Sequence, residues 1–486
     1  MSPQSTIVRS IAGLAGLLVL PSIAHAQWTY EILHPSGAHS SRATQGAAAA
    51  QGGIVQLVPD VNHAAVWNGT AASFVDLHVA GFAASSVWGC DGAVQVGAVE
   101  PVGGPYYASL WSGTPGSWVN LNPPGAIASN ALTVSGGVQG GFAAFGPVAR
   151  PGLWTGTASS WVDLMPPGFT DNGAVTDMRG GMQVGYASQS GPPRPGLWTG
   201  TAASWVQLAP SGVAYGTDGV QQVGYQLVGG SNLRACVWAG TAASVVDLAP
   251  AGSSMSVAYS VDAGEQVGGV AFPTQATRAY LWSGTAASAV DLHAALPPTY
   301  ADSEAKDIWH ANGTTYVLGT ATHGTTGVTH AVLWRRLQTA IYCVGKQNSL
   351  GCTPSISFGG SPSASGPANF IVSASNVRNQ VPGILLYGAS GRSAAPFSGG
   401  TLCVGLPLYR GPGVNSNGSN APAADCTGLF STNMNAFRAG QLGGNPQPFL
   451  SVPGTTVNCQ YWGRDPGLSA PNNAQLSNAL EYEIGT

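Results

Sequence analysis

One segment recurs along the first two thirds of this chain, and its spacing constrains the fold more than any other feature. Each copy joins a Trp to a G-T-A-A-S-like turn and a V-D-L-like run, as in LWSGTAASAVDL from residue 281. A period of about 44 residues is the size of a four-stranded propeller blade. The repeated Trp residues, with a seventh in HAVLWRR, are Trp67, Trp111, Trp154, Trp198, Trp238, Trp282 and Trp334.

Each unit reads as four short strands separated by turns. Asp-Gly turns, such as Asp91-Gly92 and Asp218-Gly219, precede β-prone runs like VQVGAV, and Asp-Gly between such runs is typical of hairpins. The sequence therefore predicts an all-β protein with a seven-bladed β-propeller over residues 27–338. A disulfide-containing, β-sandwich-like domain is predicted over residues 339–486.

The two ends of the repeat region complement each other. The seventh unit stops at Arg336, before its fourth strand, and the segment Leu33–Gly37 matches Leu208–Gly212 at the end of a complete unit. We therefore predict that residues 28–33 pair with residues 330–335 and close the ring. Closure of this kind removes two unpaired sheet edges.

The first 26 residues have the pattern of a signal peptide. An apolar run follows Arg9, and Ala24-His25-Ala26 has the small-x-small form of a cleavage site. No later segment offers the roughly 18 uninterrupted apolar residues of a membrane span. We expect a secreted or cell-surface monomer without a membrane span.

The composition of the chain limits the classes of molecule that it can bind. Only 7% of residues are charged and the formal net charge is −4, which argues against nucleic acid, because phosphates need clustered Lys and Arg. The chain contains 14 Trp, 15 Tyr and 12 Phe, so it is not a disordered Gly- and Pro-rich sequence. An extracellular glycan or a cell-surface protein remains as a partner.

The repeats resemble the extracellular HAF repeats, which are named for a His-Ala-Phe tripeptide before the blade Trp. The matching segments are His63-Ala64-Ala65-Val66-Trp67 and His330-Ala331-Val332-Leu333-Trp334, and neither has the Phe. Arg234-Ala235 and Arg278-Ala279 are variants of the same pattern. The resemblance implies secretion and a propeller-like fold, and it assigns no chemistry.

A row of polar and cationic residues stands four positions before the repeated Trp. Positions nine after the Trp are acidic or amide, and the two positions vary together across the repeats. Because the Trp strand is predicted to be third outward in its blade, we interpret these residues as structural cross-strand pairs. The alternative is a basic ring for an anionic glycan. The pairs are His63 with Asp76, Arg150 with Asp163, Arg194 with Gln207, Arg234 with Asp247, and Arg278 with Asp291, while Tyr107 stands with Asn120 and His330 with Ile32.

Aromatic residues also recur seven positions after the blade Trp. They invite an interpretation as sugar-stacking platforms, but recurrence at one position favours packing between blades. Val245 and Ala289 occupy the same place without visible compensation. The aromatic members are Phe74, Trp118, Trp161 and Trp205, with Tyr30 in the closing segment.

The repeat breaks most strongly at residues 293–315, which enlarge the seventh unit. A break in symmetry between blades is a candidate binding site, and the alternative is a solvated loop. No familiar catalytic motif occurs, so we predict no catalytic residue, metal or cofactor, although propeller enzymes that use scattered carboxylates remain possible. The candidate binding residues are Asp302, Glu304, Lys306, Asp307 and His310.

The last third contains five of the seven Cys residues. In an exported chain, four of them are candidates for two disulfides, and four Cys allow three pairings. Cys459 is left over and is expected to be buried. The disulfide candidates are Cys343, Cys352, Cys403 and Cys426.

The same segment resembles a C-terminal module of many bacterial secreted proteins. The motifs that carry the resemblance are Tyr342-Cys343, Leu402-Cys403-Val404, the run WGRDP from Trp462, and LSNALE from Leu476. The resemblance implies a surface- or export-associated module of undefined function. Arg464 and Asp465 suggest catalysis, but we expect a buried structural pair.

Three functions follow from these observations. The first is a secreted protein that binds extracellular polysaccharide or a surface partner. The second is a polysaccharide-active hydrolase or lyase that uses the propeller funnel. The third is a structural spacer for the C-terminal module.

Overall fold

The computed structural model describes residues 28–311, 314–336 and 339–485. The predicted signal peptide, residues 1–26, lies outside the described residues. The chain divides into two compact units, Gln27–Thr339 and Ala340–Ile484. Each unit is described by itself.

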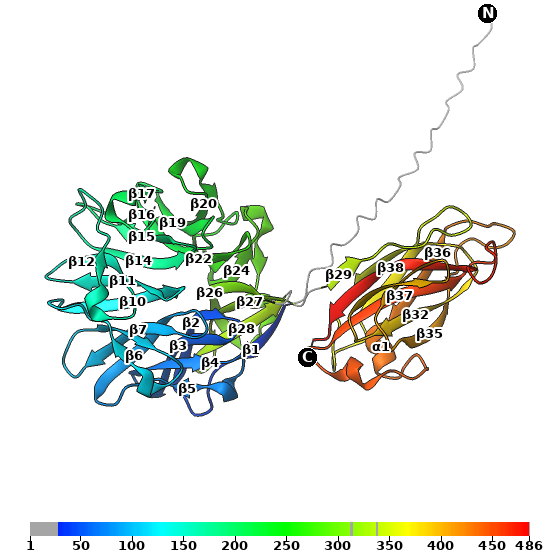
Figure 1. Cartoon of the computed structure of the whole chain (residues 1–486), viewed down its shortest axis with the longest axis horizontal. Helices are drawn as coiled ribbons and strands as arrows, with labels where there is room; N and C mark the ends of the chain where they lie inside the picture. The colour runs from blue at the N-terminus through cyan, green and yellow to red at the C-terminus, as the bar shows by residue number, and fades with distance from the viewer. Residues whose placement is uncertain (1–27, 312–313, 337–338, 486) are drawn as a thin grey trace, which may run out of the picture. The chain divides into compact units, whose positions relative to one another are not determined.

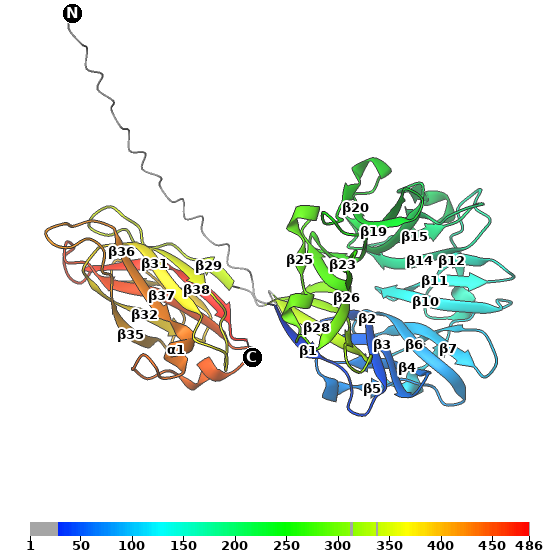
Figure 2. The same cartoon turned by 180° about the vertical axis from the view of Figure 1, so that it is seen from behind.

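The first unit is the predicted seven-bladed β-propeller, with seven four-stranded antiparallel sheets around a central channel (Figure 1 and Figure 2). In blades 1 to 6 the four strands follow chain order from the channel outward. Blade 1 contains β2 (Ser40–Ala47), β3 (Ala50–Val58), β4 (Val61–Trp67) and β5 (Val75–Asp76), and blade 2 contains β6 (Phe82–Cys90), β7 (Gln95–Pro101), β8 (Tyr107–Trp111) and β9 (Val119–Asn120). Blade 3 contains β10 (Ala128–Ser135), β11 (Val138–Ala144), β12 (Ala149–Trp154) and β13 (Val162–Asp163), and blade 4 contains β14 (Gly173–Arg179), β15 (Met182–Ala187), β16 (Arg194–Trp198) and β17 (Val206–Gln207). Blade 5 contains β18 (Gly212–Thr217), β19 (Gln222–Val228), β20 (Asn232–Trp238) and β21 (Val246–Asp247), and blade 6 contains β22 (Met255–Asp262), β23 (Glu265–Phe272), β24 (Gln275–Trp282) and β25 (Val290–Asp291).

Blade 7 joins the two ends of the propeller sequence. It contains β26 (Tyr300–Ala311), β27 (Thr314–His323) and β28 (Thr329–Arg336), and its outer strand is β1 (Trp28–Ile32). The register runs from Trp28 opposite Arg336 to Ile32 opposite Val332. In Figure 1 the dark blue β1 lies beside the yellow-green β28. The predicted closure of the ring is confirmed.

The repeated Trp fills the space between neighbouring blades. All seven blade Trp residues are at most 1% exposed. Trp111 of blade 2, for example, packs in one cluster with Val66 and Leu77 of blade 1. Burial of an indole removes about 150–250 Å² of surface from water, so this one residue type fixes the period of the repeat.

The repeated turn after the Trp is a short 3-10 helix, and its Ser side chain holds it through hydrogen bonds. In blade 1, the Ser73 hydroxyl accepts a hydrogen bond from Asn68 N at 2.8 Å and donates one to Thr70 O at 2.6 Å. The chain then enters a fourth strand of only two residues. The equivalent helices are η1 (Ala71–Ser73), η2 (Pro115–Ser117), η3 (Ala158–Ser160), η4 (Ala202–Ser204), η5 (Ala242–Ser244) and η6 (Ala286–Ser288), and η7 (His293–Ala295) precedes β26.

The aromatic residue after this turn packs on its own blade. The Trp161 ring lies 4.5 Å from that of Trp154, and a Cβ at Gly152 would approach Trp161 to 2.3 Å. Trp161 also packs against the cluster between blades 2 and 3. Tyr30 differs, since it is 38% exposed.

The second unit is β-sandwich-like. A five-stranded sheet contains β29 (Thr339–Tyr342), β38 (Ala474–Glu483), β37 (Thr456–Arg464), β32 (Pro382–Gly388) and β35 (Tyr409–Asn415). A three-stranded sheet contains β30 (Ser355–Gly359), β31 (Ile371–Val377) and β36 (Gly428–Asn433), and β33 (Arg392–Phe397) pairs with β34 (Gly400–Val404). The remaining elements are α1 (Met434–Arg438) and η8 (Pro448–Ser451). Val372, Leu385, Phe430 and Tyr461 belong to a buried core supplied by both larger sheets.

Two disulfides join parts of this unit that are distant in the sequence. They are Cys343–Cys403 and Cys352–Cys426, which settles the pairing that the sequence left open. Cys90, Cys236 and Cys459 are free and buried.

Candidate functional site

The central channel is lined by the innermost strand of every blade, and each of these strands contains a β-bulge at the equivalent position. A bulge inserts one extra residue into a strand and redirects its side chain. Each extra residue lines the same cavity of about 790 Å³. We call these residues the bulge ring: Thr44, Trp88, Leu132, Thr176, Tyr215, Tyr259 and Lys306.

Three members of the bulge ring are aromatic. Trp88 is 39% exposed, in contrast to the blade Trp residues. The rings of Tyr215 and Tyr259 lie 5.2 Å apart, and Lys306 Nζ lies 3.9 Å from the centre of the Tyr259 ring. Burial raises the pKa of Tyr215 to about 12, so its phenol stays protonated at neutral pH. The ring therefore combines apolar faces with hydroxyl and ammonium donors.

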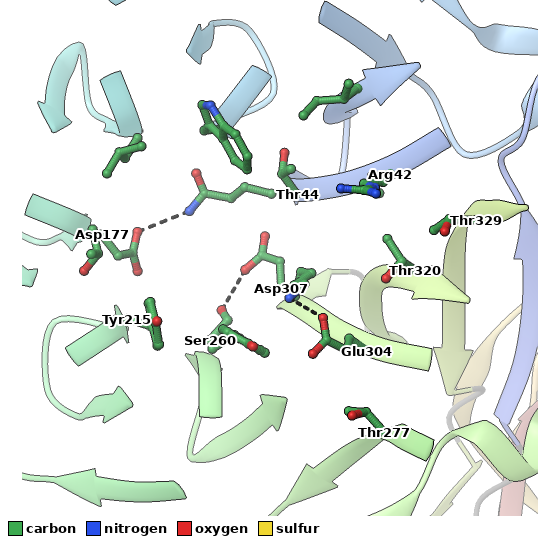
Figure 3. Close-up of a pocket in the computed structure, with 18 of the residues that line it drawn as sticks. Arg42, Thr44, Asp177, Tyr215, Ser260, Thr277, Glu304, Asp307, Thr320 and Thr329 are labelled. Carbon is green, nitrogen blue, oxygen red and sulfur yellow. Dashed lines mark hydrogen bonds and ion pairs between the residues drawn. The ribbon is translucent and has the colours of Figure 1, made fainter. Parts of the chain in front are cut away.

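The wall of this cavity is polar and nearly balanced in charge. Arg42 and Asp302 line it, and within the described ranges neither has a side-chain hydrogen bond or an ion pair. Glu304 and Lys306 form an ion pair at 2.6 Å. Thr320 and Thr329 add hydroxyl groups (Figure 3).

The candidate binding residues of the sequence lie on a strand. Tyr300–Ala311 forms β26, the innermost strand of blade 7, so the alternative of a solvated loop is wrong. A strand in a channel wall faces water on one side, which explains why it is rich in charged residues. Asp302, Glu304 and Lys306 line the wide cavity, whereas Asp307 lies deeper and His310 lines a second cavity.

The second cavity, of about 320 Å³, shares a polar constriction with the first. Both cavities are lined by Gln45, Asp177, Ser260 and Asp307, and we call the hydrogen-bonded layer that they form the waist. In Figure 3, Asp177 and Asp307 project from different strands toward the middle of the channel.

Asp177 is the centre of one half of the waist. Its carboxylate accepts hydrogen bonds from Gln45 Nε2 at 3.2 Å, from Thr133 Oγ1 at 2.9 Å and from Thr217 N at 2.9 Å. Gln45 in turn accepts one from Cys90 N at 3.1 Å. These bonds connect blades 1 to 5.

Asp307 is the centre of the other half. It accepts hydrogen bonds from Ser260 Oγ at 2.6 Å and from Gly46 N at 2.7 Å, which adds blades 6 and 7. Burial raises the pKa of Asp307 to about 7, and the nearby Asp177 charge adds to the increase. Burial also raises the pKa of Asp177. Asp307 therefore keeps its proton to a higher pH than an exposed carboxyl does.

His310 belongs to an ionic network on the other side of the waist. Its ring nitrogens lie 2.8 Å from Asp262 Oδ2 and 3.0 Å from Glu265 Oε2. Arg179 contacts Asp262 at 2.8 Å, and Arg336 contacts Glu265. This network ties blades 4, 6 and 7 together and accounts for His310 without a ligand.

The predicted row of pairs lies across the third and fourth strands, away from the channel. Arg234 Nη2 and Asp247 Oδ2 are 2.6 Å apart, and Arg278 Nη1 and Asp291 Oδ2 are 3.0 Å apart. The other ion pairs are His63–Asp76 and Arg150–Asp163.

Two of the predicted pairs, Arg194 with Gln207 and His330 with Ile32, make other contacts instead. Arg194 lies over the Phe169 ring at 5.6 Å, while Gln207 donates a hydrogen bond to Ala209 O at 3.0 Å. His330, diagonal to Ile32, contacts the Tyr300 hydroxyl at 2.8 Å instead.

In the second unit, Asp465 has a structural role with a different partner from the one expected. It is fully buried and accepts hydrogen bonds from the Ser349 amide and hydroxyl, both at 2.6 Å. Its cationic neighbour is Arg378 at 3.5 Å. Arg464, by contrast, is exposed.

Sequence reasoning missed Asp177 and most of the bulge ring. A signal was present, because six of the seven ring positions stand 22 or 23 residues before the blade Trp and change in chemistry from blade to blade. Within the described ranges, no group of three or more His, Cys, Asp or Glu is placed to hold a metal ion. No helix there is long and apolar enough to cross a bilayer.

These features define a seven-bladed β-propeller with a polar, aromatic-lined channel, joined to a β-sandwich-like unit. No family model matches the chain, and no curated protein matches its sequence. Solved propeller structures are similar in fold. The β-propeller domain of the trilobed protease from Pyrococcus furiosus has 9% identity and a TM-score of 0.41, over 62% of this chain and 96% of that one.

Two further solved structures are similar to the same degree. YCF48 bound to D1 peptide has 11% identity and a TM-score of 0.38, over 64% of this chain and 94% of that one. A puromycin hydrolase S511A mutant complexed with PGG has 10% identity and a TM-score of 0.41, and the match covers 72% of this chain but only 62% of the hydrolase. These likenesses concern the fold alone.

Proposed function

We propose that this protein is a secreted or cell-surface binding protein that takes a saccharide into the wide cavity of its propeller channel. The cavity, at about 790 Å³, has the size of a small-molecule site. A sugar ring presents C–H groups on its faces and hydroxyl groups around its edge. The aromatic faces and the surrounding hydroxyl, carboxylate and guanidinium groups of the cavity complement both.

The observation that carries the proposal is the exposure of Trp88. This indole is 39% exposed at a position where the neighbouring blades place Thr44 and Leu132. Large aromatic side chains normally stabilise a protein by burying much apolar surface in its core. An indole that instead faces a solvent-filled channel is suited to stack against a sugar ring. The bulge in β6 holds it there.

The charge of the wide cavity favours a neutral saccharide over a strongly anionic one. Arg42 and Lys306 are balanced by Asp302 and Glu304. A polyanion would meet the waist carboxylates as well. We therefore favour neutral glycans, with anionic glycans and surface proteins as other outcomes of the test.

The test is binding of a panel of soluble polysaccharides to the purified protein and to a Trp88→Ala variant. We expect affinity to fall at least about fivefold, because loss of one stacking face costs about 1 kcal/mol or more. Tyr106→Ala is the matched control, since Tyr106 is 53% exposed outside the cavity. Equal binding by the Trp88→Ala variant would contradict the proposal.

A second candidate function is cleavage of a polysaccharide in the channel. Asp307 favours it, because it lines the channel and a buried carboxyl with a raised pKa is suited to general acid catalysis. Release of reducing ends that disappears in an Asp307→Asn variant would establish an enzyme. If neither binding nor cleavage is observed, the spacer function remains.

A further inference from the structure

We infer that the channel recognises the end of a saccharide chain and not its interior. The inference rests on the proposed function and adds the mode of recognition. The inference follows from two features of the channel: hydrogen bonds of the waist cross it, and the bulge ring lies directly above the waist.

The waist is a continuous layer across the channel. Asp177 and Asp307 together collect hydrogen bonds that reach all seven blades through Gln45, Gly46 and the groups described above. The bond between Gln45 on blade 1 and Asp177 on blade 4 crosses the channel itself. A chain that enters the wide cavity therefore meets a floor and cannot thread through.

The bulge ring is at the bottom of the cavity and not at its rim. Each ring residue immediately precedes the residue at waist level in the sequence, as Tyr259 precedes Ser260 and Lys306 precedes Asp307. Asp302 lies five residues before Asp307 on the same strand. At a rise of about 3.3 Å per residue and with one residue taken up by the bulge, Asp302 lies about 13 Å above the waist, and Arg42, three residues before Gln45, lies about 7 Å above it.

The aromatic members of the ring lie on opposite sides of the axis. In a ring of seven blades, blade 2 stands across the channel from blades 5 and 6. Trp88 therefore faces Tyr215 and Tyr259, and all three line one cavity. A sugar ring that reaches this level can stack on both sides.

This depth separates the two ways of binding a polymer. A terminal unit can descend to the bulge ring while the rest of the chain leaves through the mouth. An interior unit would need the chain to descend and return through the same opening, so it can contact only rim groups such as Arg42 and Asp302. Contact with Trp88 thus selects for chain ends.

The experiment measures how many protein molecules bind each chain in a length series. Size-fractionated linear β-1,3-glucan, β-1,4-mannan and α-1,4-glucan are titrated with the protein, alongside a cyclic α-1,4-glucan that has no ends. We expect one protein per linear chain at every length and no binding of the cyclic glucan. If the number of protein molecules bound per chain rises with chain length, end recognition is overturned and the proposed function stays intact. If no glycan binds, both are overturned.

A variant that fills the bottom of the cavity provides the second test. Leu132→Trp adds bulk to the bulge ring, and we expect affinity for chain ends to fall at least about tenfold. Val102→Trp adds comparable bulk outside the cavity, where Val102 is 81% exposed, and should bind within about threefold of the wild type. Thermal unfolding checks that both variants fold. Unchanged binding by a folded Leu132→Trp variant would show that the ligand does not reach the ring, and would overturn the inference.

Discussion

Gln45 on blade 1 donates a hydrogen bond to Asp177 on blade 4, across the propeller channel, at 3.2 Å. The two residues are 132 positions apart in the sequence. In a propeller each blade packs mainly on its two neighbours, so a bond between blades 1 and 4 links blades that are not neighbours in the ring. The waist is therefore a structural element as well as the floor of the proposed site.

The first prediction concerns Asp177. Asp177→Ala removes the acceptor of three hydrogen bonds and leaves Gln45 Nε2, Thr133 Oγ1 and Thr217 N without their partner. We expect the free energy of unfolding to fall by about 2–4 kcal/mol, measured by urea denaturation with Trp fluorescence. Asp177→Asn keeps one oxygen acceptor and should cost less. A loss for Asp177→Ala no larger than for the exposed Asp247→Ala would contradict this role.

The second prediction is a pH dependence that comes from Asp307. Burial raises its pKa from 3.8 to about 7, so between these values the folded protein holds a proton that the unfolded chain has released. Stability from this group is therefore present at low pH and is lost as pH rises to about 7. Asp307→Asn mimics the protonated form. We expect the stability of the variant relative to the wild type to increase by up to about 4 kcal/mol between pH 4 and pH 8. A constant difference would refute the assignment.

The blades were predictable from the sequence because the same packing requirement occurs between every two neighbouring blades. Every gap between blades needs a large apolar group, and Trp at the end of the third strand fills it, as Trp111 does. The closing strand was predictable for the same reason, since the seventh unit lacked a partner for β28. The same logic placed Arg234 beside Asp247 on one face of a blade.

The lining of the wide cavity was harder to predict than the blades, because the positions of the β-bulges determine which side chains face the channel. A β-strand pattern does not reveal which residue is the extra one, and the bulge turns Trp88 and Tyr259 into the channel. The charged run in β26 resembled a loop because one side of that strand faces the channel. Without the spatial arrangement, nothing connected Asp177 with Asp307.

The sequence also did not reveal which residue compensates for a small side chain at the position after the 3-10 turn. Ala289 stands where blades 2 to 4 have Trp, and its smaller volume is met two positions before the blade Trp. That position is Gly152 under Trp161, but it is Tyr280 in the blade of Ala289, and both Tyr280 and Ala289 pack against the same buried cluster. The pair is visible only when the third and fourth strands are aligned in space.

The third prediction tests the pairs at the blade surface. The Arg234 and Asp247 side chains are 38% and 52% exposed, so solvent screens their attraction. We expect a double-mutant cycle with Arg234→Met and Asp247→Leu to give a coupling of about 0–1 kcal/mol that weakens in high salt. The cycle is needed because Asp247 also accepts a hydrogen bond from Ala249 N, which the single variant loses. A coupling well above this range would mean that the pair is a major stabilising contact.

The fourth prediction concerns acid sensitivity beside the closing seam. Burial, with the nearby His34 and His323, lowers the pKa of His330 from 6.5 to about 4. In this window the unfolded chain binds a proton that the folded protein does not, so the stability from His330 is complete above pH 6.5 and is lost as pH falls. After solvent screening we expect an effect of about 1 kcal/mol.

The variant for this prediction is His330→Phe, which keeps a ring next to His34 but cannot be protonated. The His34 and His330 rings are stacked at 4.2 Å. Between pH 6.5 and pH 4 the unfolding midpoint of the variant should fall less steeply than that of the wild type. Parallel curves would show that other groups cause the acid sensitivity.

The fifth prediction tests closure of the ring. Leu33 follows β1, is fully buried, and donates a backbone hydrogen bond to Ala331 O at 2.8 Å. Leu33→Ala should cost about 2–5 kcal/mol, because it leaves a cavity between blades 7 and 1. Val58→Ala is the control, since Val58 is 54% exposed, and it should change stability by less than about 0.5 kcal/mol.

Deletion of residues 28–33 removes the whole closing strand β1. It leaves the outer edge of β28 without its partner, because β1 is the strand that pairs there. An unpaired edge is a template for strands of another molecule, so we expect oligomers that increase with protein concentration, measured by light scattering. A deletion variant that stayed monomeric with an unchanged unfolding midpoint would show that the propeller holds together without this strand.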